Sequence, residues 1–354
     1  MQIMANKPSH VIGVDTHRDT NTVAVLDSVN GGVTATHQFP TSSSGYRHTL
    51  EFVQRHLSSR SWAIEGTGSY GAGLTTMLLA EDETVVEVDR PDKVARRDGI
   101  KTDEVDAVRA ARLAISWPHL AVPRAGGPRE ALRVLVAARN GAVVSKTQAI
   151  NQLKATLVSA PAAVRERITG TTDYQVRMCA RLQVRAKLDA EHRGTVMALR
   201  AIAKRVLFLE SEATDHEREI GALVAEMCPT LTDAPGVGTL TAAQVLISWS
   251  HTGRFRSEAA FAAFSGSAPI PASSGQTDRH RLSRHGDRQL NRALHTIALT
   301  RLRIDSETQA YADRRLSEGK TKKDIRRCLK RAIARQLYRH LETHANLKIG
   351  LDTI

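Results

Sequence analysis

The chain has little cysteine and no long apolar run. Its three cysteines, Cys179, Cys228 and Cys328, form no Cys-x-x-Cys pair and have no histidine at zinc-ligand spacing. This pattern argues against a structural zinc site and a disulfide framework. No segment approaches the roughly 18 apolar residues of a membrane span, and residues 1–7 lack the apolar core of a signal peptide. We therefore expect a cytoplasmic protein without a membrane partner.

Aromatic residues are also scarce, at 4%, whereas positive charge is in excess. The formal net charge is +13 and the isoelectric point is near 10.0, which predicts a polyanionic partner because such charge most often neutralises phosphates. Residues 276–340 hold 18 Lys and Arg against 7 Asp and Glu, a net +11. With so few aromatic rings for base stacking, backbone contacts by Arg and Lys are favoured.

The first third of the chain is typical of an α/β layer with a mixed sheet, because three short strands are followed by alternating helices and strands. The predicted strands are Val11–Asp15, Thr22–Leu26, Gly32–Phe39, Ser61–Glu65 and Thr84–Val88, and the predicted helices are Gly45–Leu57 and Gly71–Ala80. A stretch rich in Pro and Gly, residues 118–128, predicts a domain boundary.

The middle of the chain, residues 129–227, is helical in character. Its clearest pattern is a heptad seam with spacings that alternate between three and four residues: Leu199, Ile202, Val206, Leu209, Ala213, His216, Ile220 and Leu223. Two partners for this seam remain open, the helix that carries Leu132, Leu135, Val136 and Leu153, or a second subunit.

Four carboxylates at the ends of predicted elements are candidate metal ligands. Asp15 and Glu65 each end a strand, and Asp103 and Asp106 stand three residues apart, on one face of a predicted helix. Hard cations such as Mg²⁺ take oxygen ligands, and phosphoryl-transfer sites often hold two ions about 4 Å apart. Each carboxylate alone has a simpler interpretation as a turn residue, a cap or a complement to the helix dipole. Their conjunction favours a metal site.

Two glycine-containing turns have competing interpretations. Residues 66–71 match Gly-x-Gly-x-x-Gly between a strand and a helix, and Asp89 follows the next strand, as in dinucleotide-binding folds. Because that strand is the fourth of its domain and the chain is strongly basic, a turn that lets the helix pack closely is favoured. Residues 235–238, Pro-Gly-Val-Gly, precede a helix and either contact phosphate through free backbone N–H groups or simply connect two helices.

A loop near residue 270 ends in Ser273-Ser274-Gly275 and leads into an arginine cluster of Arg279, Arg281, Arg284 and Arg288. By composition this segment is a turn. A serine hydroxyl also attacks phosphate where a base or a metal activates it and cations stabilise the developing charge, which these arginines would supply.

Several motifs together resemble the DEDD transposases of bacterial insertion sequences, relatives of the Piv-type DNA invertases. They are Gly13-Val14-Asp15-Thr16-His17-Arg18-Asp19, Ile64-Glu65-Gly66-Thr67-Gly68-Ser69-Tyr70-Gly71, Lys101-Thr102-Asp103-Glu104-Val105-Asp106-Ala107, Pro235-Gly236-Val237-Gly238, Ala272-Ser273-Ser274-Gly275 and Arg284-His285-Gly286-Asp287-Arg288. The likeness spans nearly the whole chain, in order.

The resemblance implies a fold that combines α/β and all-α parts. It implies a RuvC/RNase H-like domain over residues 1–125, a helical coiled-coil region over 126–228 and a mainly helical C-terminal transposase domain over 229–345. It maps a catalytic quartet that binds Mg²⁺ or Mn²⁺ to Asp15, Glu65, Asp103 and Asp106, and a nucleophilic serine to Ser274, with Ser273 as the neighbouring alternative.

We therefore expect a DNA recombinase that cuts and rejoins strands through a covalent serine–DNA intermediate. The resemblance further implies donor and target DNA, a structured guide RNA called a bridge RNA, and a homo-oligomer, dimer or tetramer, as partners. One alternative is an RNase H-like nuclease that resolves Holliday junctions with the quartet alone. Another is a nucleic-acid-binding protein without catalysis.

Overall fold

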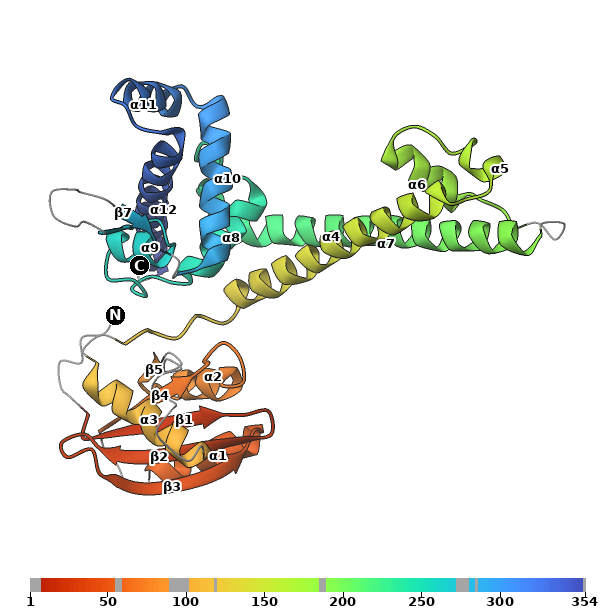
Figure 1. The fold of residues 1–354 in the computed structure, drawn as a ribbon. Coiled ribbons are helices and arrows are strands. Elements are labelled where there is room, and N and C mark those ends of the chain that lie inside the picture. Colours follow the sequence, from red (N-terminus) through yellow and green to blue (C-terminus); the bar gives the residue numbers. More distant parts are fainter. Residues whose placement is uncertain are drawn as a thin grey trace. The chain divides into compact units, whose positions relative to one another are not determined.

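A computed structural model describes residues 8–54, 59–88, 102–117, 120–184, 189–271, 280–283 and 286–352 (Figure 1). The chain divides into two compact units, residues 1–126 with 249–260, and residues 127–248 with 261–354. The first division lies beside the boundary predicted after residue 125. The boundary predicted after residue 228 falls inside the second unit, so the three-part division stays a prediction.

The first unit contains a five-stranded mixed sheet in the order β3-β2-β1-β4-β5. The first three strands, which the sequence predicted, form an antiparallel meander, and β4 and β5 run parallel to β1. The strands are β1 (His10–Thr16), β2 (Thr20–Asp27), β3 (Val33–Pro40), β4 (Arg60–Glu65) and β5 (Val85–Val88), and the helices are α1 (Ser43–Gln54), α2 (Ala72–Ala80) and α3 (Asp103–Ser116).

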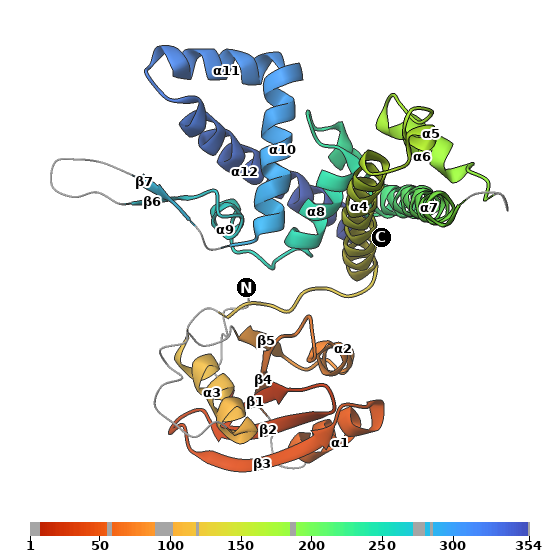
Figure 2. The same ribbon diagram turned by 45° about the vertical axis from the view of Figure 1, so that its right-hand side comes forward.

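Two apolar cores, one on each face of the sheet, follow from the alternation of side chains along a strand. Ile12 and Val14 of β1 belong to the core that also holds residues of α1 and α2. Val11 belongs to the other core, which is built against the small residues of α3, including Ala107 and Ala111. Odd-numbered positions of β1 therefore face α3, and Figure 2 shows this helix lying along the sheet.

The second unit begins with a long antiparallel helical hairpin, α4 (Pro128–Val158) and α7 (Ala190–Met227), with the short α5 (Ala162–Arg165) and α6 (Thr172–Ala180) between them. Polar pairs fix its register along its length: Arg139 with Glu217, Lys146 with Glu210, and Gln152 with Arg205. The seam residues Leu199, Ile202 and Val206 are buried in the same core as residues of α4. In this structure the seam therefore closes within one chain, and a supercoiled coiled coil stays a prediction.

The described residues of the rest of the chain are mainly helical, and two short strands among them form a hairpin (Figure 2). Its elements are the 3-10 helix η2 (Pro229–Asp233), α8 (Thr239–Trp249), α9 (Glu258–Phe264), β6 (Pro269–Pro271), β7 (His280–Leu282), α10 (Arg288–Ile304), α11 (Ser306–Ser317) and α12 (Lys322–Asp352). Helix α12 packs on α10 and α11. Among the described helices, none combines the length and the apolar character that a bilayer crossing requires.

Candidate metal centre and nucleic-acid contacts

Asp15 and Glu65 lie at the same edge of the sheet. Their strands, β1 and β4, are parallel neighbours in which Val14 pairs with Ile64, so the two carboxylates follow at adjacent carboxyl ends. The hydroxyl of Thr16 donates a hydrogen bond of 3.1 Å to the Glu65 carbonyl oxygen and ties the two strand ends together. Both carboxylates occupy positions whose alternation points to the α3 face of the sheet.

Helix α3 brings the other two carboxylates to this edge. Thr102 is its N-cap, with the Thr102 hydroxyl oxygen accepting from the Val105 N–H at 3.3 Å. Asp103 and Asp106 stand in the first turn, where negative charge also stabilises the helix dipole. The simpler interpretation, in which Asp103 and Asp106 lie in the first turn of a capped helix, therefore also holds. It also fixes where the helix starts, and hence where both carboxylates lie.

The tightest cluster at this edge contains Asp15, Asp103 and a residue that the sequence analysis did not select, His17. One ligand atom from each lies within 4.8 Å of the other two. The His17 Nε2 atom is 3.0 Å from Asp15 Oδ2 and 3.3 Å from Asp103 Oδ1. The only signal for His17 in the sequence is its position two residues after Asp15, which keeps it on the same face if the strand continues.

Like charges converge on Asp15, the most buried of the clustered groups. Burial raises the pKa of the Asp15 carboxyl, the adjacent His17 lowers it, and the negative charges of Asp106 and Asp103 raise it. The net pKa lies above its ordinary value. Asp106 also accepts a hydrogen bond of 3.0 Å from Arg109.

This donor set fits a hard divalent cation. Carboxylate oxygens are the ligands that Mg²⁺ and Mn²⁺ prefer. Burial is the main cause of the raised pKa of Asp15, and the negative charges of Asp106 and Asp103 add to it. A bound cation would offset that repulsion. Glu65 and Asp106 stand at the same edge and would complete the oxygen ligands. Their ligand roles remain proposals.

The Gly-x-Gly-x-x-Gly segment forms a closed turn. Gly66 has a φ of +68°, and its carbonyl oxygen accepts from the N–H groups of Ser69 at 2.8 Å and Gly71 at 3.3 Å. These amides are therefore occupied, as expected for a structural turn that introduces α2. Asp89, the acidic residue that a dinucleotide site would require, lies outside the described residues.

The Pro-Gly-Val-Gly turn is anchored to α10. Gly236 has a φ of +74°, and a Cβ there would lie 3.0 Å from the Arg301 side chain. The buried Arg301 donates to the Pro235 carbonyl oxygen at 2.7 Å and to Gln336 at 2.8 Å, and burial lowers its pKa. The turn thus has a packing role, and a phosphate contact there stays a prediction.

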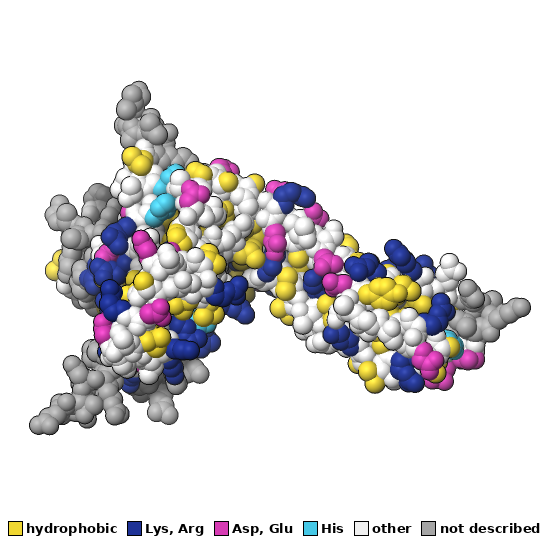
Figure 3. All heavy atoms as spheres, turned by 90° about the horizontal axis from the view of Figure 1, so that it is seen from above, with side chains coloured by type: hydrophobic (Ala, Val, Ile, Leu, Met, Phe, Trp, Pro, Cys, Tyr) yellow, Lys and Arg dark blue, Asp and Glu magenta, His cyan; other side chains and the backbone are white. Residues whose placement is uncertain are grey.

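The candidate nucleophile and half of the arginine cluster are not placed. Ser273, Ser274, Arg279 and Arg284 lie outside the described residues. Arg281 on β7 and Arg288 at the start of α10 are exposed. Figure 3 shows Lys and Arg side chains gathered over the α10–α12 end of the second unit, among scattered Asp and Glu.

Gly286 and Asp287, within the same basic motif, have clear structural roles. A Cβ on Gly286 would come within 2.4 Å of the Phe264 carbonyl oxygen, and its φ is +108°. Asp287 caps α10 by accepting from Gln289 and Leu290.

Two family models match the chain. Residues 12–160 match a transposase model of the DEDD, IS110 type, and residues 228–313 match one described as the transposase IS116/IS110/IS902 family. The chain is 38% identical over 125 residues to an uncharacterized 43.6 kDa protein of insertion element IS110 from Streptomyces coelicolor, covering 34% of this chain and 31% of that protein. It is 29% identical over 160 residues to an uncharacterized 42 kDa protein of insertion element IS900 from Mycobacterium paratuberculosis, covering 43% and 39%. The matched segments thus span less than half of either relative.

Proposed function

The chain belongs to the IS110 family of transposases, and we propose that it cuts and rejoins DNA strands with a divalent cation held at the edge where β1, β4 and α3 meet. The observation that carries this proposal is the convergence of Asp15 and Asp103 within one cluster of ligand atoms. Parallel strand pairing and the start of α3 bring Glu65 and Asp106 to the same edge.

Two of the four carboxylates, Asp15 and Asp103, have distinct tasks in this proposal. Asp15 is held on a strand and is largely buried, with 14% of its side chain exposed, so it provides the rigid ligand. Asp103 is half exposed, so it would be the ligand that is open to incoming substrate. When bound, Mg²⁺ or Mn²⁺ would polarise the scissile phosphate and neutralise its charge. His17 keeps the two aspartates together through its contacts with both.

We propose Ser274 as the nucleophile in the second unit. Its hydroxyl oxygen forms a bond to phosphorus while the bond from phosphorus to the leaving deoxyribose oxygen breaks, and the hydroxyl proton passes to a base. Attack by a strand-end hydroxyl then reverses the exchange, which rejoins DNA and releases the serine. Arg279, Arg281, Arg284 and Arg288 would stabilise the charge on the phosphate oxygens.

The partners in this proposal are donor DNA, target DNA and a structured guide RNA, with the protein acting as a dimer or tetramer. The strong positive charge of residues 276–340 supports a nucleic-acid partner. The guide RNA and the oligomer rest on the family likeness.

A covalent adduct tests this function. The protein is incubated with a nicked DNA substrate that carries an element end, and the trapped complex is digested for peptide mass spectrometry. We expect nucleotide on the peptide that contains Ser274, and no adduct with Ser274→Ala. An adduct on Ser273 would move the assignment by one residue. Metal-dependent cleavage without an adduct, retained in Ser274→Ala, would instead support a nuclease that uses the carboxylates alone.

A further inference from the structure

A cavity lies among α5, α6 and the part of α7 where that helix begins (Figure 1). Its volume is about 470 Å³, within the roughly 300–1,000 Å³ of pockets that bind small organic groups. Ten residues line it, and none of the ten is Asp or Glu. The cavity is therefore larger than a single ion requires, and its lining carries no negative charge.

The floor of the cavity is the surface of a packed core. Val164, Ile168 and Val196 are buried members of the core that the helical hairpin shares with α5 and α6. Met178 and Leu182 are partly buried and pack against the same core. Because these side chains are already held by their neighbours, the floor offers an apolar surface before any ligand binds.

The rim of the cavity is polar and positively charged. Arg167 and Arg181 are exposed, and among the described residues neither guanidinium group makes a hydrogen bond or an ion pair. Gln183 is also exposed, and its amide both donates and accepts hydrogen bonds. His192 is partly buried, with its Nδ1 atom 3.9 Å from the Oδ2 atom of Asp189, which is beyond hydrogen-bond distance. The two arginines are thus available to an anion.

The segment that forms the cavity is more basic than the chain around it. Residues 161–200 hold 8 Lys and Arg against 4 Asp and Glu, a net +4. Outside residues 276–340 the whole chain carries only +2, so the remaining segments together carry a net −2. The cavity therefore lies in a second positively charged part of the sequence, which favours an anionic ligand.

We propose that this cavity binds one unpaired nucleotide of a nucleic-acid strand. The apolar floor would cover the face of the base, as in pockets that hold extruded bases. Gln183 and His192 would form hydrogen bonds with the edge of the base. Arg167 and Arg181 would bind the attached phosphate. A phosphate alone would leave the apolar floor uncovered, and an apolar ligand would not use the two arginines.

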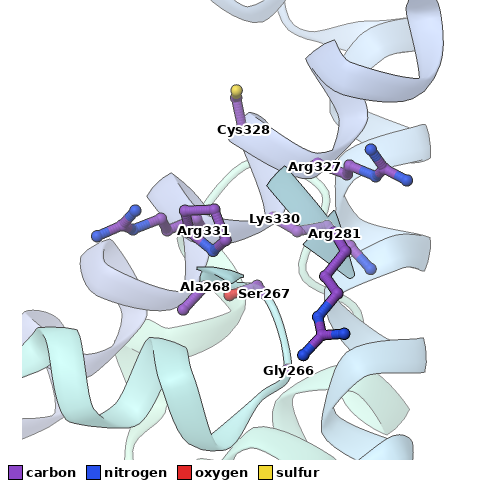
Figure 4. A pocket seen from close by; sticks show the side chains of 9 residues that line it. Gly266, Ser267, Ala268, Arg281, Arg327, Cys328, Lys330 and Arg331 are labelled. Atoms are coloured by element: carbon purple, nitrogen blue, oxygen red, sulfur yellow. The ribbon is translucent and has the colours of Figure 1, made fainter. Parts of the chain in front are cut away.

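A second basic pocket, of about 120 Å³, lies where the β6–β7 hairpin meets α12. In Figure 4 the side chains of its Arg281, Arg327 and Arg331 extend in different directions. That pocket therefore lacks the space and the converging donors that a nucleotide needs.

This inference rests on the proposed function in taking nucleic acid as the partner. It adds that recognition includes an unpaired base, and it places this contact on α5, α6 and α7 rather than in the basic region of residues 276–340. The two proposals fail separately, because Asp15→Asn should lose cleavage and keep nucleotide binding at the cavity.

Methyl NMR of isotope-labelled methionines tests the cavity, because Met178 lines it. The probe is a short single-stranded oligothymidylate, and Met178→Leu identifies the resonance. The probe should shift the Met178 methyl signal and leave that of Met77, on α2, unchanged. The same strand with abasic sites keeps its phosphates and should produce no shift.

Two arginine variants separate the cavity from general attraction. Arg181→Gln should weaken binding of the probe about tenfold, which corresponds to the loss of one charge-assisted hydrogen bond. Arg177→Gln is the matched control, because Arg177 is exposed one helical turn earlier and does not line the cavity. This control should bind as the wild type does, and circular dichroism shows that both variants fold.

An unmoved Met178 signal in the wild-type protein would overturn the proposal. An equal shift with the abasic strand would also do so, since it would reduce the contact to phosphate attraction. Equal weakening in Arg177→Gln would indicate diffuse attraction by the basic segment. Equal affinity for free thymidine monophosphate, or for a fully paired duplex, would exclude an unpaired nucleotide of a strand as the ligand.

Discussion

Gly13 on β1 and Ala107 on α3 pack so closely that a Cβ built on Gly13 would lie 1.9 Å from the Ala107 carbonyl oxygen. Only a residue without a side chain allows this approach. Ala107 follows Asp106 directly, and Gly13 precedes Asp15 by two residues on the same face of β1. The contact therefore sets the distance between the strand carboxylate and the helix carboxylates.

Gly13→Ala should move α3 away from the sheet. Because the obstacle is backbone, the loss of stability should exceed the roughly 1–3 kcal/mol of ordinary overpacking. Thermal unfolding measures this loss, and metal-dependent cleavage should fall with it. Gly126→Ala is the matched control, since a Cβ there has open space within 4 Å. Equal stability of the two variants would contradict the close packing.

Asp106→Asn should abolish strand cleavage and keep the fold. Its ion pair with Arg109 is partly exposed, with side chains 26% and 30% accessible, and such pairs contribute about 0–1 kcal/mol. Removing one of several carboxylates also reduces the repulsion among the remaining negative charges in the metal-free protein. Circular dichroism and a cleavage assay with Mg²⁺ check both parts. Full metal-dependent activity would remove Asp106 from the site.

Two positions close together on α7 allow the buried and the exposed face of the hairpin to be compared. Val206 is 3% exposed and Phe208 is 68% exposed. Val206→Lys should lose about 2 kcal/mol of apolar burial and add the cost of a buried ammonium. Phe208→Lys should fold normally. Circular dichroism and light scattering report both variants, and a folded Val206→Lys with reduced assembled mass would place the seam between subunits.

Thiol reactivity should follow burial. Burial raises the pKa of Cys179 to about 11 and also raises that of Cys228, although hydrogen bonds at Cys228 lower it in part. Since the thiolate is the nucleophile, both stay protonated near pH 8. Cys328 is exposed. Iodoacetamide should therefore modify Cys328 first in the native protein, and mass spectrometry of the peptides shows the order. Faster labelling of Cys179 would contradict its buried position.

The strands of the sheet could be predicted from the sequence because the patterns that identify them are local. Alternating apolar residues and turn residues predicted the five strands, and their carboxyl ends located Asp15 and Glu65. Asp103 and Asp106 were selected because they stand three residues apart, on one face of a predicted helix. These predictions need only neighbours along the chain.

Other features depend on contacts that sequence patterns do not encode. The heptad pattern from Leu199 identified a buried stripe but not its partner, because an apolar stripe fits α4 or another chain equally well. His17 was not predicted because a single histidine after a strand is common in sequences. Its contact with Asp103, which lies on a helix distant in sequence, is visible only in the structure. Lys330 of α12 donates a hydrogen bond to Asn291 of α10, and this pairing across 39 residues has no local signal.

Iron-directed cleavage of the polypeptide chain is the most direct test of the metal centre. Fe²⁺ replaces Mg²⁺ in the DNA-free protein, ascorbate generates short-lived radicals, and mass spectrometry maps the breaks. We predict breaks around Asp15, Glu65 and residues 103–106, competed by Mg²⁺ and lost in Asp15→Asn. Breaks confined to other segments, or an unchanged pattern in Asp15→Asn, would contradict a metal site at the junction of β1, β4 and α3.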